Sequence, residues 1–80
     1  MIFDPRKYKV GEQVRIADYS ALEEFRRAWT FHHPLSEEQL NWAGRTAEVT
    51  EAAMYHGGDI IYRLKNVPGI WHEQLLEGAE

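Results

Sequence analysis

The sequence predicts a mostly β domain: a small antiparallel barrel of about five strands, with one or two short helices inserted between the first and second strands. Two observations lead to this prediction. From Gly44 onward, short segments alternate apolar and polar residues, which is the period of a strand with one buried face. Glycines and a proline separate these segments where tight turns need them. The length of 80 residues predicts a single domain over residues 1–80.

The first strand is predicted within residues 8–16. Gly11 allows a sharp bend, because glycine adopts backbone conformations that other residues avoid. After this bend, Val14 and Ile16 are expected to face inward, while Gln13 and Arg15 face water.

The inserted helical segment is predicted at about residues 20–43. Its first helix is expected to begin with Ser20 as the N-cap and to end near Trp29, because Pro34 disfavours helix just before it. Apolar residues recur there at helical spacing: Ala21, Leu22, Phe25, Ala28 and Trp29. The second helix is short, with Ser36 and Gln39 at the spacing of a capping box and Gly44 placed to end it.

The remaining strands follow the period of two. Ala47 and Val49 are expected to face inward, as is the apolar row Ile60, Tyr62 and Leu64. Turns are predicted at residues 56–59 and 66–69, with Pro68 and Gly69 in the second turn. A strand then begins at Ile70, and Leu75 and Leu76 complete the core. Trp71 is predicted to lie in the core rather than on a recognition surface.

These segments together resemble a known family. The motifs are Val10-Gly11-x-x-Val14-Arg15-Ile16, Gly44-x-x-x-x-Val49, the Gly57-Gly58 hairpin, and Tyr62-x-Leu64 before Trp71-x-Glu73. This pattern, over about Tyr8 to Glu77, resembles SH3-like barrels. More narrowly, it resembles the β-subunit domain of nitrile hydratases and the small accessory subunits of photosystem I and ferredoxin-thioredoxin reductase. The nitrile hydratase relatives carry a His-x-Arg-x-Pro-like segment, where this chain has Phe31-His32-His33-Pro34-Leu35 without the arginine.

The composition narrows the classes of function. The chain has no cysteine, which excludes disulfides and thiolate zinc sites and is typical of a reducing compartment, so a cytoplasmic location is expected. No signal peptide or membrane span is visible, and no membrane partner is expected. The net charge of −4 opposes binding to nucleic acid.

The inserted segment carries more apolar side chains than one small barrel needs, so part of it is expected to face a partner. The predicted partner-binding residues are Trp29, Phe31 and Trp42, with His32 and His33 beside them. Aromatic anchors supply most of the binding energy at many interfaces. The predicted function is therefore a non-catalytic protein-binding or accessory module of a larger complex. A protein partner or a second copy of the chain would dock on this aromatic patch.

Two other functions stay open. As a subunit of a nitrile hydratase-like metalloenzyme, the chain would line a pocket with His32, His33 and His72. As a weak nucleic-acid-binding barrel, it would stack Tyr8 on a base beside a basic cluster. That cluster consists of Arg6, Lys7, Lys9 and Arg15.

The histidines allow a structural interpretation and a chemical one. His32 and His33 are expected to point apart, because neighbours in an extended chain face opposite sides. A metal site from His33, His56 and His72 is the alternative. His72-Glu73 is expected to be an exposed polar edge, the alternative being an acid and base pair with Asp59. No catalytic residue, metal ligand, cofactor or small-molecule substrate is predicted.

Overall fold

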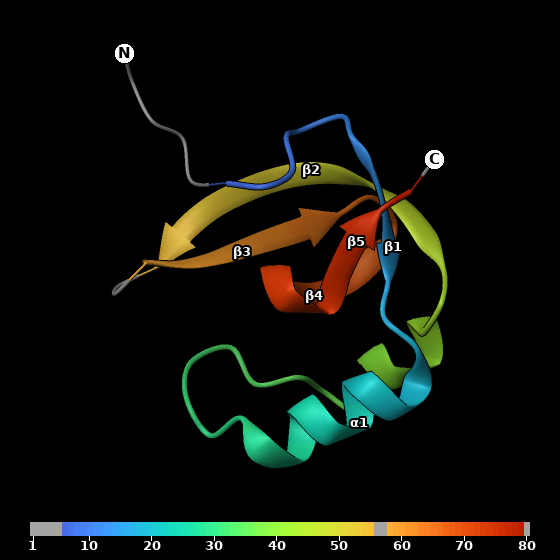
Figure 1. Ribbon diagram of the computed structural model, residues 1–80, viewed down its shortest axis with the longest axis vertical. Helices are drawn as coiled ribbons and strands as arrows, with labels where there is room; N and C mark the ends of the chain where they lie inside the picture. Colours follow the sequence, from blue (N-terminus) through green and yellow to red (C-terminus); the bar gives the residue numbers. More distant parts are fainter. Residues whose placement is uncertain (1–5, 56–57, 80) are drawn as a thin grey trace.

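The computed structural model describes residues 6–55 and 58–79. In these residues, five antiparallel strands form one sheet in the order β4-β3-β2-β1-β5 (Figure 1). In chain order the elements are β1 (Gln13–Ile16), α1 (Tyr19–Ala28), the 3-10 helix η1 (Glu38–Trp42), β2 (Thr46–Tyr55), β3 (Asp59–Leu64), β4 (Val67–His72), the 3-10 turn η3 (Glu73–Leu75) and β5 (Leu76–Gly78). The mostly β prediction is confirmed, as is the helical segment between the first two strands. The sheet is open, because no pairing in the described part of the chain joins β4 to β5.

The long strand β2 connects the two halves of the sheet and curves strongly (Figure 1). Its first residues pair with β1, as in Val14 opposite Ala47, and its later residues pair with β3, ending with Tyr55 opposite Asp59. The register shifts by a β-bulge between Val49 and Glu51, at the point where the partner changes. Bulges bend and twist a strand, which explains the curvature.

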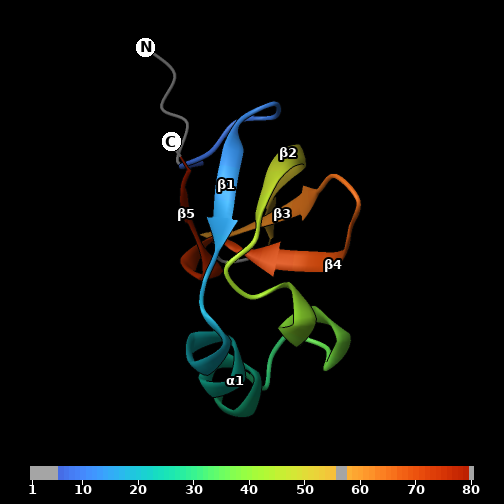
Figure 2. The same ribbon diagram turned by 90° about the vertical axis from the view of Figure 1, so that its right-hand side faces the viewer.

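The core lies between the curled sheet and the inserted helices, which sit together at one end of the sheet (Figure 2). Val14 and Ile16 are buried, as is the row Ile60, Tyr62 and Leu64, so both predicted inward faces are confirmed. Trp71 is 0% exposed, and its indole Nε1 donates a hydrogen bond to the Pro68 carbonyl at 3.2 Å. Trp71 is therefore a core residue, as predicted. The insertion contributes Leu22, Leu35 and Leu40 to the same core.

Helix α1 begins two residues earlier than predicted. The N-cap is Asp18, whose Oδ1 accepts hydrogen bonds from the Ala21 backbone N–H at 2.9 Å and from the Ser20 hydroxyl at 3.1 Å. Ser20 lies inside the first turn, so its prediction as the cap was wrong. Aspartate and serine cap helices about equally well, and the sequence offers both within one turn.

The second helical element forms as a 3-10 helix, η1, and its predicted capping box is confirmed. The Ser36 backbone N–H donates to Gln39 Oε1 at 2.8 Å, and the Gln39 backbone N–H donates to Ser36 Oγ at 3.3 Å. Gly44 adopts φ +75°, as expected after a helix. The buried Gln39 side chain also donates from Nε2 to the Ile70 carbonyl at 3.1 Å, which ties η1 to β4.

The turn between β3 and β4 differs from the prediction. Leu64 pairs with Val67, so the turn consists of Lys65 and Asn66, with Asn66 at φ +60°. Asparagine tolerates this left-handed conformation better than most residues. The prediction placed the turn two residues later because it relied on Pro68-Gly69. Pro68 and Gly69 instead lie within β4, an edge strand in which a missing N–H is tolerated. In the predicted turn at 56–59, His56 and Gly57 lie outside the described residues.

Candidate functional site

The segment between α1 and η1, residues 29–37, packs its first rings against the turn end of the β2–β3 hairpin and against β4. It begins at Trp29, which is half-buried and stacks on Phe25 with ring centroids 5.1 Å apart. The Trp29 indole Nε1 donates to the His32 carbonyl at 2.7 Å and so closes a tight turn. Phe31 lies within this turn, edge-on to Trp29 at 5.1 Å, and is 68% exposed. We call Trp29 and Phe31 the aromatic surface.

His32 holds this segment to the sheet. Its Nε2 lies 2.6 Å from Asp59 Oδ2, and its ring stacks on Tyr55 at 4.0 Å. A carboxylate oxygen accepts hydrogen bonds, so His32 Nε2 carries the proton in this contact. Tyr55 is the last residue of β2 and Asp59 is the first residue of β3, so this pair lies at the turn end of the β2–β3 hairpin.

His32 and His33 contact each other, so the prediction that they point apart was wrong. Their Nδ1 atoms are 2.7 Å apart, a hydrogen-bond distance at which one ring donates and the other accepts. The prediction assumed an extended backbone, whereas His33 has φ +50° and turns the chain. A left-handed histidine is a strained conformation, which persists only when its surroundings hold it.

His72 is buried, so the prediction of an exposed polar edge was wrong. Only 3% of its surface is exposed, and its Nε2 donates to the His33 carbonyl at 2.9 Å. Burial lowers the pKa of His72 from its usual value of 6.5, so the ring is neutral at pH 7. Trp29 and Phe25 pack against its ring, with both ring centroids 4.9 Å away.

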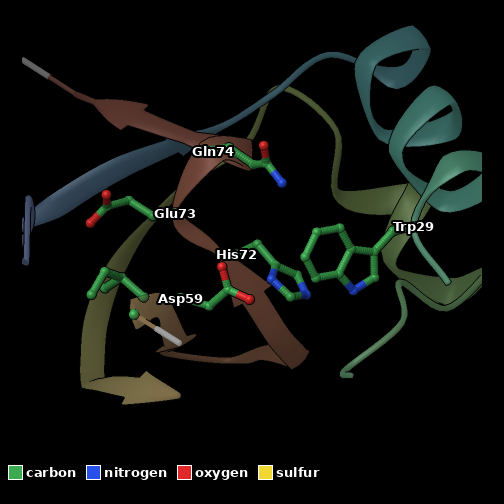
Figure 3. A pocket seen from close by; sticks show the side chains of 7 residues that line it. Trp29, Asp59, His72, Glu73 and Gln74 are labelled. Carbon is green, nitrogen blue, oxygen red and sulfur yellow. The ribbon is translucent and has the colours of Figure 1, made fainter. Parts of the chain in front are cut away.

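Beside His72 lies an open pocket of about 300 Å³ (Figure 3). The figure shows the imidazole of His72 between the Asp59 carboxylate and the Trp29 indole. The lining residues are Trp29, Gly58, Asp59, Ile60, His72, Glu73 and Gln74. The alternative prediction that Asp59 and His72-Glu73 share a cleft is therefore consistent with this geometry.

Glu73 also holds residues 7 and 8 in place. Its Oε2 accepts hydrogen bonds from the Tyr62 hydroxyl at 2.6 Å and from the Lys7 backbone N–H at 2.9 Å. Burial and the hydrogen bond to Glu73 raise the pKa of Tyr62. The Tyr8 backbone N–H donates to the same hydroxyl at 3.2 Å, so residues 7 and 8 are held against the core.

The predicted stacking of Tyr8 on a nucleic-acid base is contradicted by its burial. Tyr8 is 5% exposed, its ring packs near Tyr62, and its hydroxyl donates to the Leu76 carbonyl at 3.1 Å. The neighbouring charges are exposed, as expected of Arg6, Lys7, Lys9 and Arg15. The cluster therefore lacks the aromatic platform that binding of single strands uses.

The structure brings together four of the five predicted partner-binding residues. Trp29, Phe31, His32 and His33 form one continuous set of ring contacts. Trp42 lies elsewhere, half-buried, with the Arg45 guanidinium 5.3 Å from its ring centroid. Tyr55 was missed by sequence reasoning, although an aromatic residue directly before a glycine turn was the available signal.

No group of three histidine and carboxylate side chains among residues 6–55 and 58–79 has the spacing to hold a metal ion. The alternative site from His33, His56 and His72 includes His56, which lies outside the described residues. Within the described ranges, no helix is long and apolar enough to cross a membrane.

No known protein family, curated protein or solved structure matches the chain.

Proposed function

We propose that the chain is a non-catalytic protein-binding module, which docks a basic segment of a partner protein on the aromatic surface, Trp29 and Phe31. The observation that carries the proposal is Phe31, a large apolar side chain that is 68% exposed on a firmly held segment. Aromatic residues of this kind dominate the energy of protein interfaces.

The segment that presents Phe31 is organised before any partner binds. The indole bond of Trp29, the contact of His32 with Asp59, and the bond of His72 to the His33 carbonyl hold it at three points. A surface held in its binding conformation loses less entropy on association, which raises affinity. The strained backbone of His33 supports the same proposal, because such strain gathers at functional sites.

Charge favours a basic partner over a second copy of the chain. Asp59 and Glu73 lie next to Trp29 in the same pocket, and the whole chain carries −4. In a symmetric dimer this surface would face itself, so like charges would meet. A foreign segment with basic side chains meets no such repulsion.

The fold that we propose for the chain is an SH3-like barrel, which would serve as an accessory module. It is supported by the five antiparallel strands, by the curvature of β2 and by the position of the helical segment between β1 and β2. A role as a subunit of a nitrile hydratase-like metalloenzyme stays a prediction.

A library of random peptides displayed on phage tests the proposal. We expect peptides selected on the chain to combine basic and apolar residues, and to lose affinity by about tenfold or more on Phe31→Ser. Val10→Ser is the matched control, because Val10 is 64% exposed and lies in the turn before β1. The peptides selected on the unchanged chain should bind Val10→Ser with the same affinity.

Two results would overturn the proposal. One is a set of selected peptides that bind Phe31→Ser as well as the unchanged chain. The other is a stable dimer, seen by light scattering, that Phe31→Ser dissociates, because the surface would then belong to a second copy.

A further inference from the structure

The pocket next to the aromatic surface is lined by hydrogen-bond acceptors. Asp59 and Glu73 contribute carboxylates, and each uses one oxygen within the protein: Oδ2 with His32 and Oε2 with Tyr62 and Lys7. The second oxygen of each accepts no hydrogen bond from any residue that the structure describes. Asp59 and Glu73, each with spare acceptor capacity, therefore both line one open pocket. The Asp59 carboxylate lies beside His72 (Figure 3).

His72 supplies an independent third acceptor. Its Nε2 must carry the proton, because a carbonyl oxygen, that of His33, can only accept. The neutral ring then has a lone pair on Nδ1, for which no described residue provides a donor. His72 is only 3% exposed and lines the pocket. Among the described residues no buried side-chain nitrogen or oxygen lacks a hydrogen-bond partner, so Nδ1 is reached from the pocket rather than sealed in the core.

The indole of Trp29 also lines the pocket, and its ring lies 4.9 Å from that of His72. The negative face of an aromatic ring attracts a cation, and guanidinium groups stack on such rings most often. The two carboxylates among the lining residues repel an anion such as phosphate, and together with the indole they favour a flat cation with several donors.

We propose that this pocket binds the guanidinium group of an arginine side chain. The proposal deepens the proposed function and rests on it, because it places an arginine of the partner segment beside its contact with Phe31. Arginine suits the site better than lysine, since its planar fork has five donors that can reach separated acceptors. A metal ion suits it less, because these groups are not spaced as ligands of one ion within residues 6–55 and 58–79.

Nuclear magnetic resonance titration of the whole chain tests the pocket with a defined probe, N-acetyl-L-arginine methylamide. We expect saturable shifts of the Trp29 indole N–H and of the Asp59 and Glu73 amides. The citrulline analogue has the same shape without the charge, so it should bind about tenfold more weakly. The lysine analogue should fall between the two.

Variants that remove one pocket charge sharpen the test. Asp59→Asn and Glu73→Gln should each weaken the arginine probe by about fivefold or more. Glu51→Gln removes the same charge outside the pocket, where Glu51 pairs with the exposed Arg63 at 3.1 Å. It should change affinity by less than about twofold.

Equal affinity for the arginine and citrulline analogues would overturn the proposal that the pocket binds arginine. So would a loss of affinity on Glu51→Gln as large as the loss on Asp59→Asn or Glu73→Gln. The comparison of analogues needs no variant, so it decides even if a substitution disturbs the fold. Displayed peptides that depend on Phe31 but contain no required arginine would refute the pocket alone. Arginine binding at the pocket, with peptides indifferent to Phe31→Ser, would refute the proposed docking surface instead.

Discussion

Gly69→Ala probes the contact that fastens the inserted segment to the sheet. Gly69 has φ +87°, and a Cβ built there would lie 2.7 Å from the side chain of Gln39. The left-handed backbone costs a non-glycine residue about 1 to 2 kcal/mol. Displacing Gln39 weakens its bonds to the Ser36 N–H and the Ile70 carbonyl, at about 0.5 to 1.5 kcal/mol each. We expect the free energy of unfolding to fall by about 2 to 5 kcal/mol in urea titrations followed by tryptophan fluorescence.

Gly44→Ala separates the two causes. Gly44 has φ +75°, but a Cβ there meets nothing within 4 Å, so this variant should lose only the backbone contribution, about 1 to 2 kcal/mol. Adding Gln39→Ala to Gly69→Ala removes the clash, so the two losses should sum to more than the double variant shows. The reasoning is refuted if Gly69→Ala costs no more than Gly44→Ala, or if the two substitutions are simply additive.

Three further predictions concern the core and the titrating groups. Trp71→Ala should lower the free energy of unfolding by about 3 to 5 kcal/mol, and an unchanged melting temperature would contradict its burial. The folded pKa of His72 is lowered, so the unfolded chain binds the proton more readily and stability should fall as pH drops below about 6.5. His72→Gln should flatten that slope in urea midpoints, and an identical slope would count against it. Tyr62→Phe removes the hydroxyl that bridges Glu73 and Tyr8, so unfolding midpoints should show a loss of about 1 to 3 kcal/mol rather than none.

Much of the fold was predictable because it depends on local patterns. The alternation at Val14 and Ile16, and at Ile60, Tyr62 and Leu64, identified the buried faces correctly. The capping box of Ser36 and Gln39 also follows from spacing alone. The turn before β4 was misplaced because Pro-Gly usually marks a turn, whereas an edge strand can also accommodate it.

The candidate site was less predictable because long-range contacts build it. Aromatic content indicated Trp29 and Phe31, but no local pattern brings His32 to Asp59, which lies far along the chain. The positive φ of His33 has no sequence signal comparable to that of glycine. Burial of His72 depends on Trp29 and Phe25, which belong to another element.

The position of the insertion has a consequence for how this protein can vary. Residues 17–45 leave the sheet at Ile16 and return at Thr46, and these ends lie close because β1 and β2 pair. Doubling the length of a flexible connection adds only about 0.6 kcal/mol to the cost of closing it. We therefore expect the sheet to tolerate an exchanged or lengthened insertion, provided that it still supplies three leucines in the places of Leu22, Leu35 and Leu40. A grafted segment would then replace the proposed docking surface without redesign of the strands.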